Sequence, residues 1–164
     1  MKSPHTPSSI WRNPVHFVAF GLGIGAVGIA PGTWGTVLAV PLYVLLQDLA
    51  PVTYIAGICV LFIAGIWICD VTTRDIGVAD HPGIVFDEIV GFLVTMTAAP
   101  NGWLWLVYGF LLFRLFDIWK PWPICVIDRR MHGGAGIMLD DAIAGVFSFT
   151  VLQLTEYLVR IGVD

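Results

Sequence analysis

The spacing of the charged residues constrains this chain more than any other feature. No Asp, Glu, Lys or Arg occurs between Arg12 and Asp48, and residues 49–69 form a second uncharged, mostly apolar stretch. A helix of that length can cross a hydrocarbon core of about 30 Å. Only 12% of the 164 residues are charged and 57% are hydrophobic, with a mean hydropathy of +0.85. So few charges could not cover the surface of a soluble domain of this size, so we predict an integral membrane protein.

The remaining composition excludes several partners. The net charge of −4 disfavours a polyanion, so we expect no nucleic-acid partner. Cys59, Cys69 and Cys125 form no C-x-x-C pair and are interpreted as small apolar residues rather than as a disulfide or zinc framework. The sequence leaves the oligomeric state open.

The apolar segments predict an all-α fold, an integral membrane helical bundle with one polar cytoplasmic face. Pro100-Asn101-Gly102 is a strong turn signal that separates two of its helices. Thr33, Asn101 and Asp140 are the expected N-caps. We expect a polar N-terminal segment over 1–20, followed by a single membrane domain over 21–164. The five expected apolar helices cover about 33–49, 52–69, 84–99, 102–119 and 140–160.

The basic residues predict the orientation of the bundle. With the N-terminus in the cytoplasm, Arg160 alone among the Lys and Arg residues falls on the outer side, as the positive-inside rule favours. The residues then expected on the cytoplasmic side are Lys2, Arg12, Arg74, Arg114, Lys120, Arg129 and Arg130. Most acidic residues fall on the same side, within the windows 70–88 and 114–141. The site is therefore expected at a membrane surface, where a lipid headgroup lies.

Two acidic pairs are the strongest candidates for chemistry. Asp87-Glu88 is expected to open the third helix and Asp140-Asp141 the fifth. Asp87 and Asp141 each precede a glycine by four residues, about one helical turn, so close packing at those glycines would bring the pairs together. Clustered carboxylates favour a hard cation, and Mg²⁺ is the usual one where phosphate is handled. The alternative is that the acids only complement the helix dipoles.

Asp117 and two cations extend this candidate site. Asp117 falls at the C-terminal end of its helix, where a carboxylate is disfavoured by the dipole, and Arg114 and Lys120 are each three residues away. We interpret Asp117 as a further metal ligand, and Arg114 and Lys120 as groups that hold phosphate oxygens. The alternative is an intrahelical salt bridge with snorkelling cations.

Two glycine-containing segments are candidates for substrate contact. In the polar loop 128–136, Gly133 and Gly134 would let the backbone approach an anion, and His132 is a candidate general acid. Arg129 beside them would bind substrate or anionic membrane lipid. In the segment 31–36, which carries Thr33 and Thr36, free backbone N–H groups at a helix start could meet a phosphate.

Four stretches together resemble the phosphatidylglycerophosphatase A family. They are residues 31–36 (PGTWGT), 84–91 (IVFDEIVG), 113–124 (FRLFDIWKPWPI) and 132–141 (HGGAGIMLDD). The resemblance runs from about Gly21 to the last helix, in the same order and with similar spacing. Any one stretch alone would be weak evidence, but the four together are specific.

The resemblance implies a bacterial inner-membrane enzyme that crosses the membrane several times. Such an enzyme uses Mg²⁺ to hydrolyse phosphatidylglycerophosphate to phosphatidylglycerol and phosphate. The acidic motif positions of the family match Asp87, Glu88, Asp117, Asp140 and Asp141, and its basic position matches Lys120. We expect Mg²⁺-assisted attack of water on phosphorus, with His132 as one candidate for protonating the leaving glycerol oxygen. The alternative is a covalent aspartyl-phosphate on Asp117 or Asp141.

Two other kinds of protein fit the sequence less well. A small transporter or channel would use intramembrane acids as a proton or cation path, but here the acids gather at one face. A structural membrane subunit would not explain two acidic pairs with a Gly-His loop. The D-G-x-x-A-R pattern of CDP-alcohol transferases and the S-G-H element of lipid phosphatases with a histidine nucleophile are both missing from the sequence.

Overall fold

The computed structural model describes residues 7–79 and 81–163, and these residues form helices but no strand. Seven are α-helices: α1 Pro14–Ala19, α2 Pro31–Leu46, α3 Pro51–Ile76, α4 Phe86–Thr95, α5 Trp103–Trp119, α6 Ile124–Arg130 and α7 Gly133–Val163. Two short 3-10 helices, η1 Ser8–Trp11 and η2 Ile24–Ala26, flank α1. The all-α prediction is confirmed. Lys2 and Asp80, which the topology prediction assigned to the cytoplasmic side, lie outside the described residues.

The five expected helices correspond to α2, α3, α4, α5 and α7, but their ends differ from the prediction. None of the three expected N-caps is correct. Ala30 precedes α2 and Gly102 precedes α5, whereas Asp140 lies inside α7, which begins at Gly133. A Cβ on Gly134 would lie 2.0 Å from the Ile66 carbonyl oxygen of α3. Close packing on α3 therefore makes this glycine-rich segment helical despite the low helix propensity of glycine.

Two helices, α1 and α6, were not expected. Within the segment 1–20, which was expected to be polar, the described residues include α1, and α1 contacts α3. His16 of α1 is buried and bridges two elements: Nδ1 lies 3.0 Å from Ser9 Oγ, and Nε2 lies 3.0 Å from Asp75 Oδ2 near the end of α3. Helix α6 follows the Pro-rich turn that ends α5, and its last residues together with the start of α7 occupy most of the segment 128–136, where a loop was expected.

Two helices are long and apolar enough to cross a membrane, α3 and α7, and α2 is a shorter apolar helix. At 1.5 Å per residue α3 extends about 39 Å and α7 about 46 Å, whereas the ten residues of α4 extend only about 15 Å. Large apolar side chains cover the outside of α3. Val52 is 80% exposed and Ile63 is 69% exposed, as expected of a surface that faces lipid.

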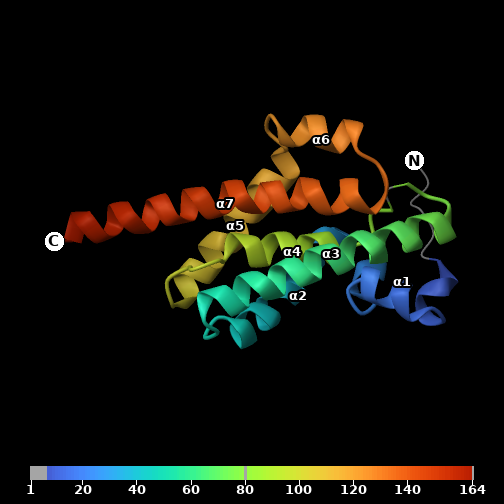
Figure 1. Ribbon diagram of the computed structural model, residues 1–164, viewed down its shortest axis with the longest axis horizontal. Helices are drawn as coiled ribbons and strands as arrows, with labels where there is room; N and C mark the ends of the chain where they lie inside the picture. Colours follow the sequence, from blue (N-terminus) through green and yellow to red (C-terminus); the bar gives the residue numbers. More distant parts are fainter. Residues whose placement is uncertain (1–6, 80, 164) are drawn as a thin grey trace.

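Helix α4 lies in the centre of the bundle, where it packs against α2, α3, α5 and α7 (Figure 1). Its buried residues include Val90, Phe92 and Leu93. Helix α7 runs along the whole bundle, and its C-terminal part projects beyond the other helices. The starts of α2 and α4, the end of α5 and the first half of α7 come together at one end, as the two charge-rich windows predicted.

Gly91 and Gly145 give α4 and α7 their close contact, as the sequence predicted. A Cβ on Gly145 would lie 2.5 Å from the Gly91 carbonyl oxygen and 3.0 Å from Val94 Cβ. A Cβ on Gly91 would lie 2.8 Å from the Asp141 carbonyl oxygen. Because neither glycine has a side chain, α4 and α7 pack closely, and Asp87 and Asp141 therefore lie at the same level on two neighbouring helices.

Gly145→Ala is expected to lower the free energy of unfolding by about 1–3 kcal/mol, the usual cost of overpacking a core. The atom nearest to the added methyl group is a backbone oxygen, that of Gly91, which cannot move aside as the end of a flexible side chain could. Gly57→Ala in α3 is the matched control, because a Cβ there has no neighbour within 4 Å and alanine is the better helix former. Thermal unfolding in detergent would compare the two variants. Equal midpoints would contradict the packing argument.

Candidate active site

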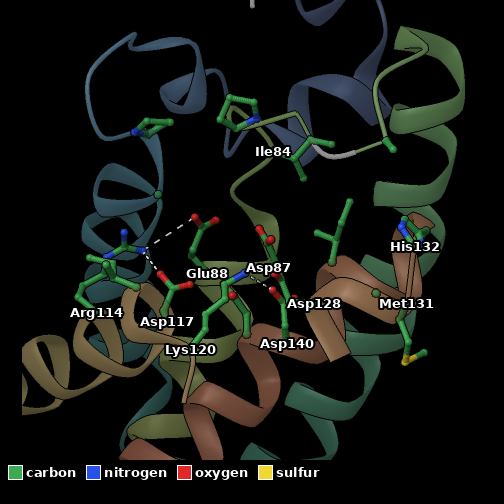
Figure 2. A pocket seen from close by; sticks show the side chains of 18 of the residues that line it. Ile84, Asp87, Glu88, Arg114, Asp117, Lys120, Asp128, Met131, His132 and Asp140 are labelled. Atoms are coloured by element: carbon green, nitrogen blue, oxygen red, sulfur yellow. Dashed lines mark hydrogen bonds and ion pairs between the residues drawn. The ribbon is translucent and has the colours of Figure 1, made fainter. Parts of the chain in front are cut away.

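A polar cavity of about 410 Å³ lies where α2, α4, α5 and α7 meet, and α6 covers part of it (Figure 2). Nearly all the charged residues singled out in the sequence reach it. Those that line it are Asp87, Glu88, Arg114, Asp117, Lys120, Asp140 and Asp141, together with Asp128 from α6. Pro31, Gly32, Pro82 and Ile84 are among the apolar residues that complete its wall.

Three of the acids form a group that could bind a metal ion. Asp87 and Glu88 in the first turn of α4 and Asp141 in α7 each present a carboxylate oxygen, and these oxygens lie within 4.8 Å of one another. One buried oxygen of each carboxylate (Asp87 Oδ1, Glu88 Oε2 and Asp141 Oδ2) has no hydrogen-bond partner. Buried carboxylate oxygens need a partner, and a hard divalent cation takes oxygen ligands. These three residues fit an Mg²⁺ ion.

Electrostatics at the start of α4 favour the same conclusion. Burial, and then the neighbouring Glu88 carboxylate, hold the pKa of Asp87 well above its usual value. Burial and the nearby Asp141 carboxylate raise the pKa of Glu88 to about 8. Neighbouring carboxylates that lose water resist ionisation together. A bound cation would remove this penalty, because the ionised oxygens would then face a positive charge.

The other two predicted metal ligands, Asp117 and Asp140, each form an ion pair with a cation. Asp117 Oδ2 lies 2.5 Å from Arg114 Nη1, which is also 3.9 Å from Glu88 Oε1. Asp140 Oδ2 accepts a hydrogen bond of 2.6 Å from Lys120 Nζ. The sequence prediction placed all five acids at the metal. In the structure Asp87, Glu88 and Asp141 are grouped, while Asp117 and Asp140 lie beside that group and hold Arg114 and Lys120.

Lys120 is held firmly at the end of α5. Its backbone is left-handed, with φ 44°, and its N–H bonds to the Phe116 carbonyl to close the helix. Its ammonium donates hydrogen bonds to Asp128 Oδ1 at 2.5 Å and to Asp140 Oδ2 at 2.6 Å. Although burial alone would lower the pKa of Lys120, these two carboxylates raise it above its usual value. Lys120 therefore presents a fixed positive charge to the cavity.

The predicted substrate-contact residues are divided between the cavity and other parts of the fold. His132 and Gly133 line the cavity, and Figure 2 shows His132 on the opposite side from Arg114 and Asp117. Four other candidates do not line it: Thr33, Thr36, Arg129 and Gly134. The buried Thr36 hydroxyl donates a hydrogen bond to the Gly32 carbonyl at 2.9 Å. Gly134 packs against α3.

Two residues of the site were not singled out in the sequence. Asp128 pairs with Lys120 across eight residues, and its place in the same charged window was a signal that could have indicated this. Gly32 lies against the acids. A Cβ on Gly32 would lie 2.1 Å from Glu88 Oε1 and 3.1 Å from Arg114 Nη1. No sequence pattern distinguishes this glycine from its neighbours, because the contact depends on tertiary packing.

Gly32→Ala is expected to lower activity about 10- to 100-fold without unfolding the protein, because small displacements of catalytic groups have effects of this size. The added methyl group would displace the Glu88 carboxylate and crowd the Arg114 guanidinium, while alanine suits the helix. Gly57→Ala serves again as the control. Turnover, and the rise in melting temperature on adding Mg²⁺, would be measured for both variants. Unchanged turnover in Gly32→Ala would show that Glu88 needs no fixed position.

An apolar, all-α bundle with grouped acids beside Arg and Lys at one end has the donor set of metal-assisted chemistry on a phosphate group. The family model described as phosphatidylglycerophosphatase A matches residues 17–156. The chain therefore belongs to the phosphatidylglycerophosphatase A family and is an enzyme of that class, as the motifs in the sequence indicated.

Similar proteins support the assignment. The phosphatidylglycerophosphatase A of Escherichia coli (strain K12) is 42% identical over 156 residues, which cover 92% of this chain and 88% of that protein. The phosphatidylglycerophosphatase A of Haemophilus influenzae is 40% identical over 147 residues, 88% of this chain and 90% of that protein. A protein of Bacteroides thetaiotaomicron, provisionally named a phosphatidylinositol-3-phosphatase, is 36% identical over 150 residues, 87% of this chain and 93% of its own. No solved structure matches the chain.

Proposed function

We propose that the cavity hydrolyses the phosphomonoester of phosphatidylglycerophosphate, with Mg²⁺ held by Asp87, Glu88 and Asp141. The observation that carries this proposal is the grouping of those three carboxylates, within 4.8 Å of one another, in the same cavity as Arg114 and Lys120. Carboxylates alone would repel a phosphate, and cations alone would not hold Mg²⁺. Both sets together suit a phosphomonoester bound with a divalent cation.

Each set of residues has a separate part in this proposal. When bound, Mg²⁺ would supply Lewis-acid polarisation of the phosphate and would lower the pKa of water. Arg114 and Lys120 would bind the non-bridging phosphate oxygens, as charge-assisted donors. Asp117 positions the Arg114 guanidinium, and Asp128 and Asp140 position the Lys120 ammonium. These pairs fix the direction of each cation before substrate arrives, which lowers the cost of organising the site.

The leaving glycerol oxygen needs a proton, and His132 is the candidate donor. It is exposed and lines the cavity from the side opposite Arg114, so a phosphate between them would be reached from two sides. An imidazole can both donate and accept a proton, which suits it to this transfer. The mechanistic alternative, a phosphate carried covalently by Asp117 or Asp141, would be tested by trapping radiolabelled phosphate on the quenched enzyme.

We further propose that this end of the bundle faces the cytoplasm of a bacterium, with α3 and α7 crossing its inner membrane. Among the described residues, Arg12 after η1, Arg74 near the end of α3, and Arg129 and Arg130 of α6 belong to elements at the end of the bundle opposite the α7 C-terminus. That distribution follows the positive-inside rule. Anionic lipid around Arg129 and Arg130 on α6 would be the natural neighbour of the site.

Phosphate release would test the proposed activity directly. The purified protein in detergent would be supplied with phosphatidylglycerophosphate or with phosphatidylinositol 3-phosphate, each with Mg²⁺ and with EDTA. We expect Mg²⁺-dependent release from phosphatidylglycerophosphate. Release from the inositol lipid alone would assign a different substrate to the same site. Release from neither lipid would favour a transporter, for which proton or cation flux into vesicles is the measurement.

A further inference from the structure

An apolar groove of about 300 Å³ lies on the side of the bundle, apart from the polar cavity. The residues that line it come from four parts of the fold: Val18, Gly21 and Leu22 in α1 and the turn after it, Leu38, Pro41, Leu42 and Leu45 of α2, Leu61 of α3, and Phe86 and Ile89 of α4. All the residues that line it are apolar. Neither metal ligands nor phosphate contacts belong to this groove, so the activity described above leaves it without a role.

The groove opens sideways, toward the surroundings of the bundle. Helices α2 and α3 pack mainly on other elements, α4 among them, rather than on each other, so the space between them is not closed by their side chains. Leu45 at the rim is 78% exposed, and Pro41 beside it is also exposed. In a membrane this opening would face the hydrocarbon region, because it lies between an apolar helix and a candidate spanning helix.

The groove is also connected to the active site through two elements. On α4, Phe86 directly precedes Asp87 and Ile89 directly follows Glu88, so two groove residues flank two proposed metal ligands within one helical turn. On α2, Gly32 lines the polar cavity and Leu38 lines the groove. Leu38 is six positions after Gly32, a rise of about 9 Å. Leu45 lies about 20 Å from Gly32 along the helix, so this side of the groove extends along α2 away from the cavity.

We propose that the groove holds one acyl chain of the lipid substrate while its phosphomonoester lies in the polar cavity. This inference rests on the proposed function, since it takes the substrate to be a membrane lipid. In such a lipid a glycerol, a phosphodiester and a second glycerol separate the terminal phosphate from the acyl chains, and α2 likewise lines the cavity at Gly32 and the groove further along at Leu38. An acyl chain has no hydrogen-bonding groups to satisfy. A peptide segment would bring N–H and C=O groups that find no partner in an apolar wall.

Filling the groove tests this inference. Leu42→Trp places an indole in the groove. Val44→Trp makes the same change at a position of α2 that is 45% exposed and does not line the groove. Each variant would be assayed on dipalmitoyl phosphatidylglycerophosphate and on its water-soluble deacylated form, which keeps the same phosphomonoester. We expect Leu42→Trp to lower the ratio of kcat/KM for the diacyl over the deacylated substrate at least tenfold. Val44→Trp should keep the wild-type ratio.

The possible results distinguish a failure of the groove proposal from a failure of the proposed function. If wild-type protein releases phosphate from neither substrate, the proposed function fails. If it releases phosphate and the ratio is the same in Leu42→Trp and wild type, the groove proposal is overturned. As a second measurement on wild-type protein, a phosphatidylglycerophosphate analogue with a mid-chain diazirine should crosslink to Leu42 or Leu61, and unlabelled diacyl substrate should compete. Crosslinks spread evenly over the exposed face of α3 would instead indicate surrounding lipid and would overturn the proposal.

Discussion

Replacing Asp141 with Asn is expected to lower Mg²⁺-dependent phosphate release by about three orders of magnitude, because the loss of metal-assisted charge stabilisation costs several kcal/mol in a transition state. Asp141 is buried on α7 and forms a group with Asp87 and Glu88. One of its carboxylate oxygens has no hydrogen-bond partner. Asparagine keeps the size of the side chain but removes the negative charge. The measurement is phosphate release from detergent-solubilised phosphatidylglycerophosphate over a range of Mg²⁺ concentrations.

Melting temperature separates a metal ligand from a structural acid. A ligand that binds only the folded state stabilises it by RT ln(1 + c/Kd), where c is the ligand concentration, so the melting temperature rises with ligand concentration. Wild-type protein should therefore melt higher with Mg²⁺ than with EDTA, and Asp141→Asn should lose most of that difference. In EDTA the variant should melt no lower than wild type, because one of three neighbouring carboxylates has been neutralised. A structural role would show the opposite result, a lower melting temperature in EDTA with the Mg²⁺ response intact.

Glu156→Gln is the matched control for Asp141→Asn. Glu156 lies on the same helix, four turns further from the cavity, and does not line it. The same change from acid to amide there should alter neither turnover nor the Mg²⁺ response. Full activity of Asp141→Asn at saturating Mg²⁺ would remove this residue from the metal site and leave Asp87 and Glu88 as the only members of the group.

The sequence predicted at which end of the bundle the site lies, but not which of its charged side chains lie together. Uncharged stretches located the helices, because a charge inside an apolar bundle is costly. The charged residues outside those stretches were therefore expected to cluster toward one end of the bundle. Which carboxylates face one another depends on helix rotation, and Gly91 and Gly145 set that rotation through backbone contacts. Spacing alone therefore could not show that Asp117 pairs with Arg114 and Asp140 with Lys120.

Helix ends were the least predictable part of the fold. Asp140 has the chemistry of an N-cap, yet α7 begins seven residues earlier at Gly133. The energy that decides this start comes from Gly134 packing on α3, a contact between residues far apart in the chain. Helix α6 was missed for a related reason. Its seven residues are too few to stand alone as a helix, and Ile124, buried in the core, shows that packing holds it in place.

Lys120→Ala is expected to lower kcat/KM about 100- to 1,000-fold, the range found when a fixed donor to a developing negative charge is removed. Lys120 is the cation that two carboxylates hold at the cavity, through bonds to Asp128 and Asp140. Lys120→Arg keeps the charge and should retain part of the activity, although the planar guanidinium points its donors differently. Arg160→Ala, at the far end of α7, is the control for a change in net charge.

A loss of activity in Lys120→Ala has a second possible cause, because the variant leaves the Asp128 and Asp140 carboxylates without their shared cation. Combining Lys120→Ala with Asp128→Asn separates the two explanations. If carboxylate repulsion distorts the site, the double variant should regain activity, since one of the facing charges is gone. If Lys120 binds the phosphate, the double variant should stay as slow as Lys120→Ala. We expect the second result, with the rise in melting temperature on adding Mg²⁺ preserved in both variants because the three grouped acids are unchanged.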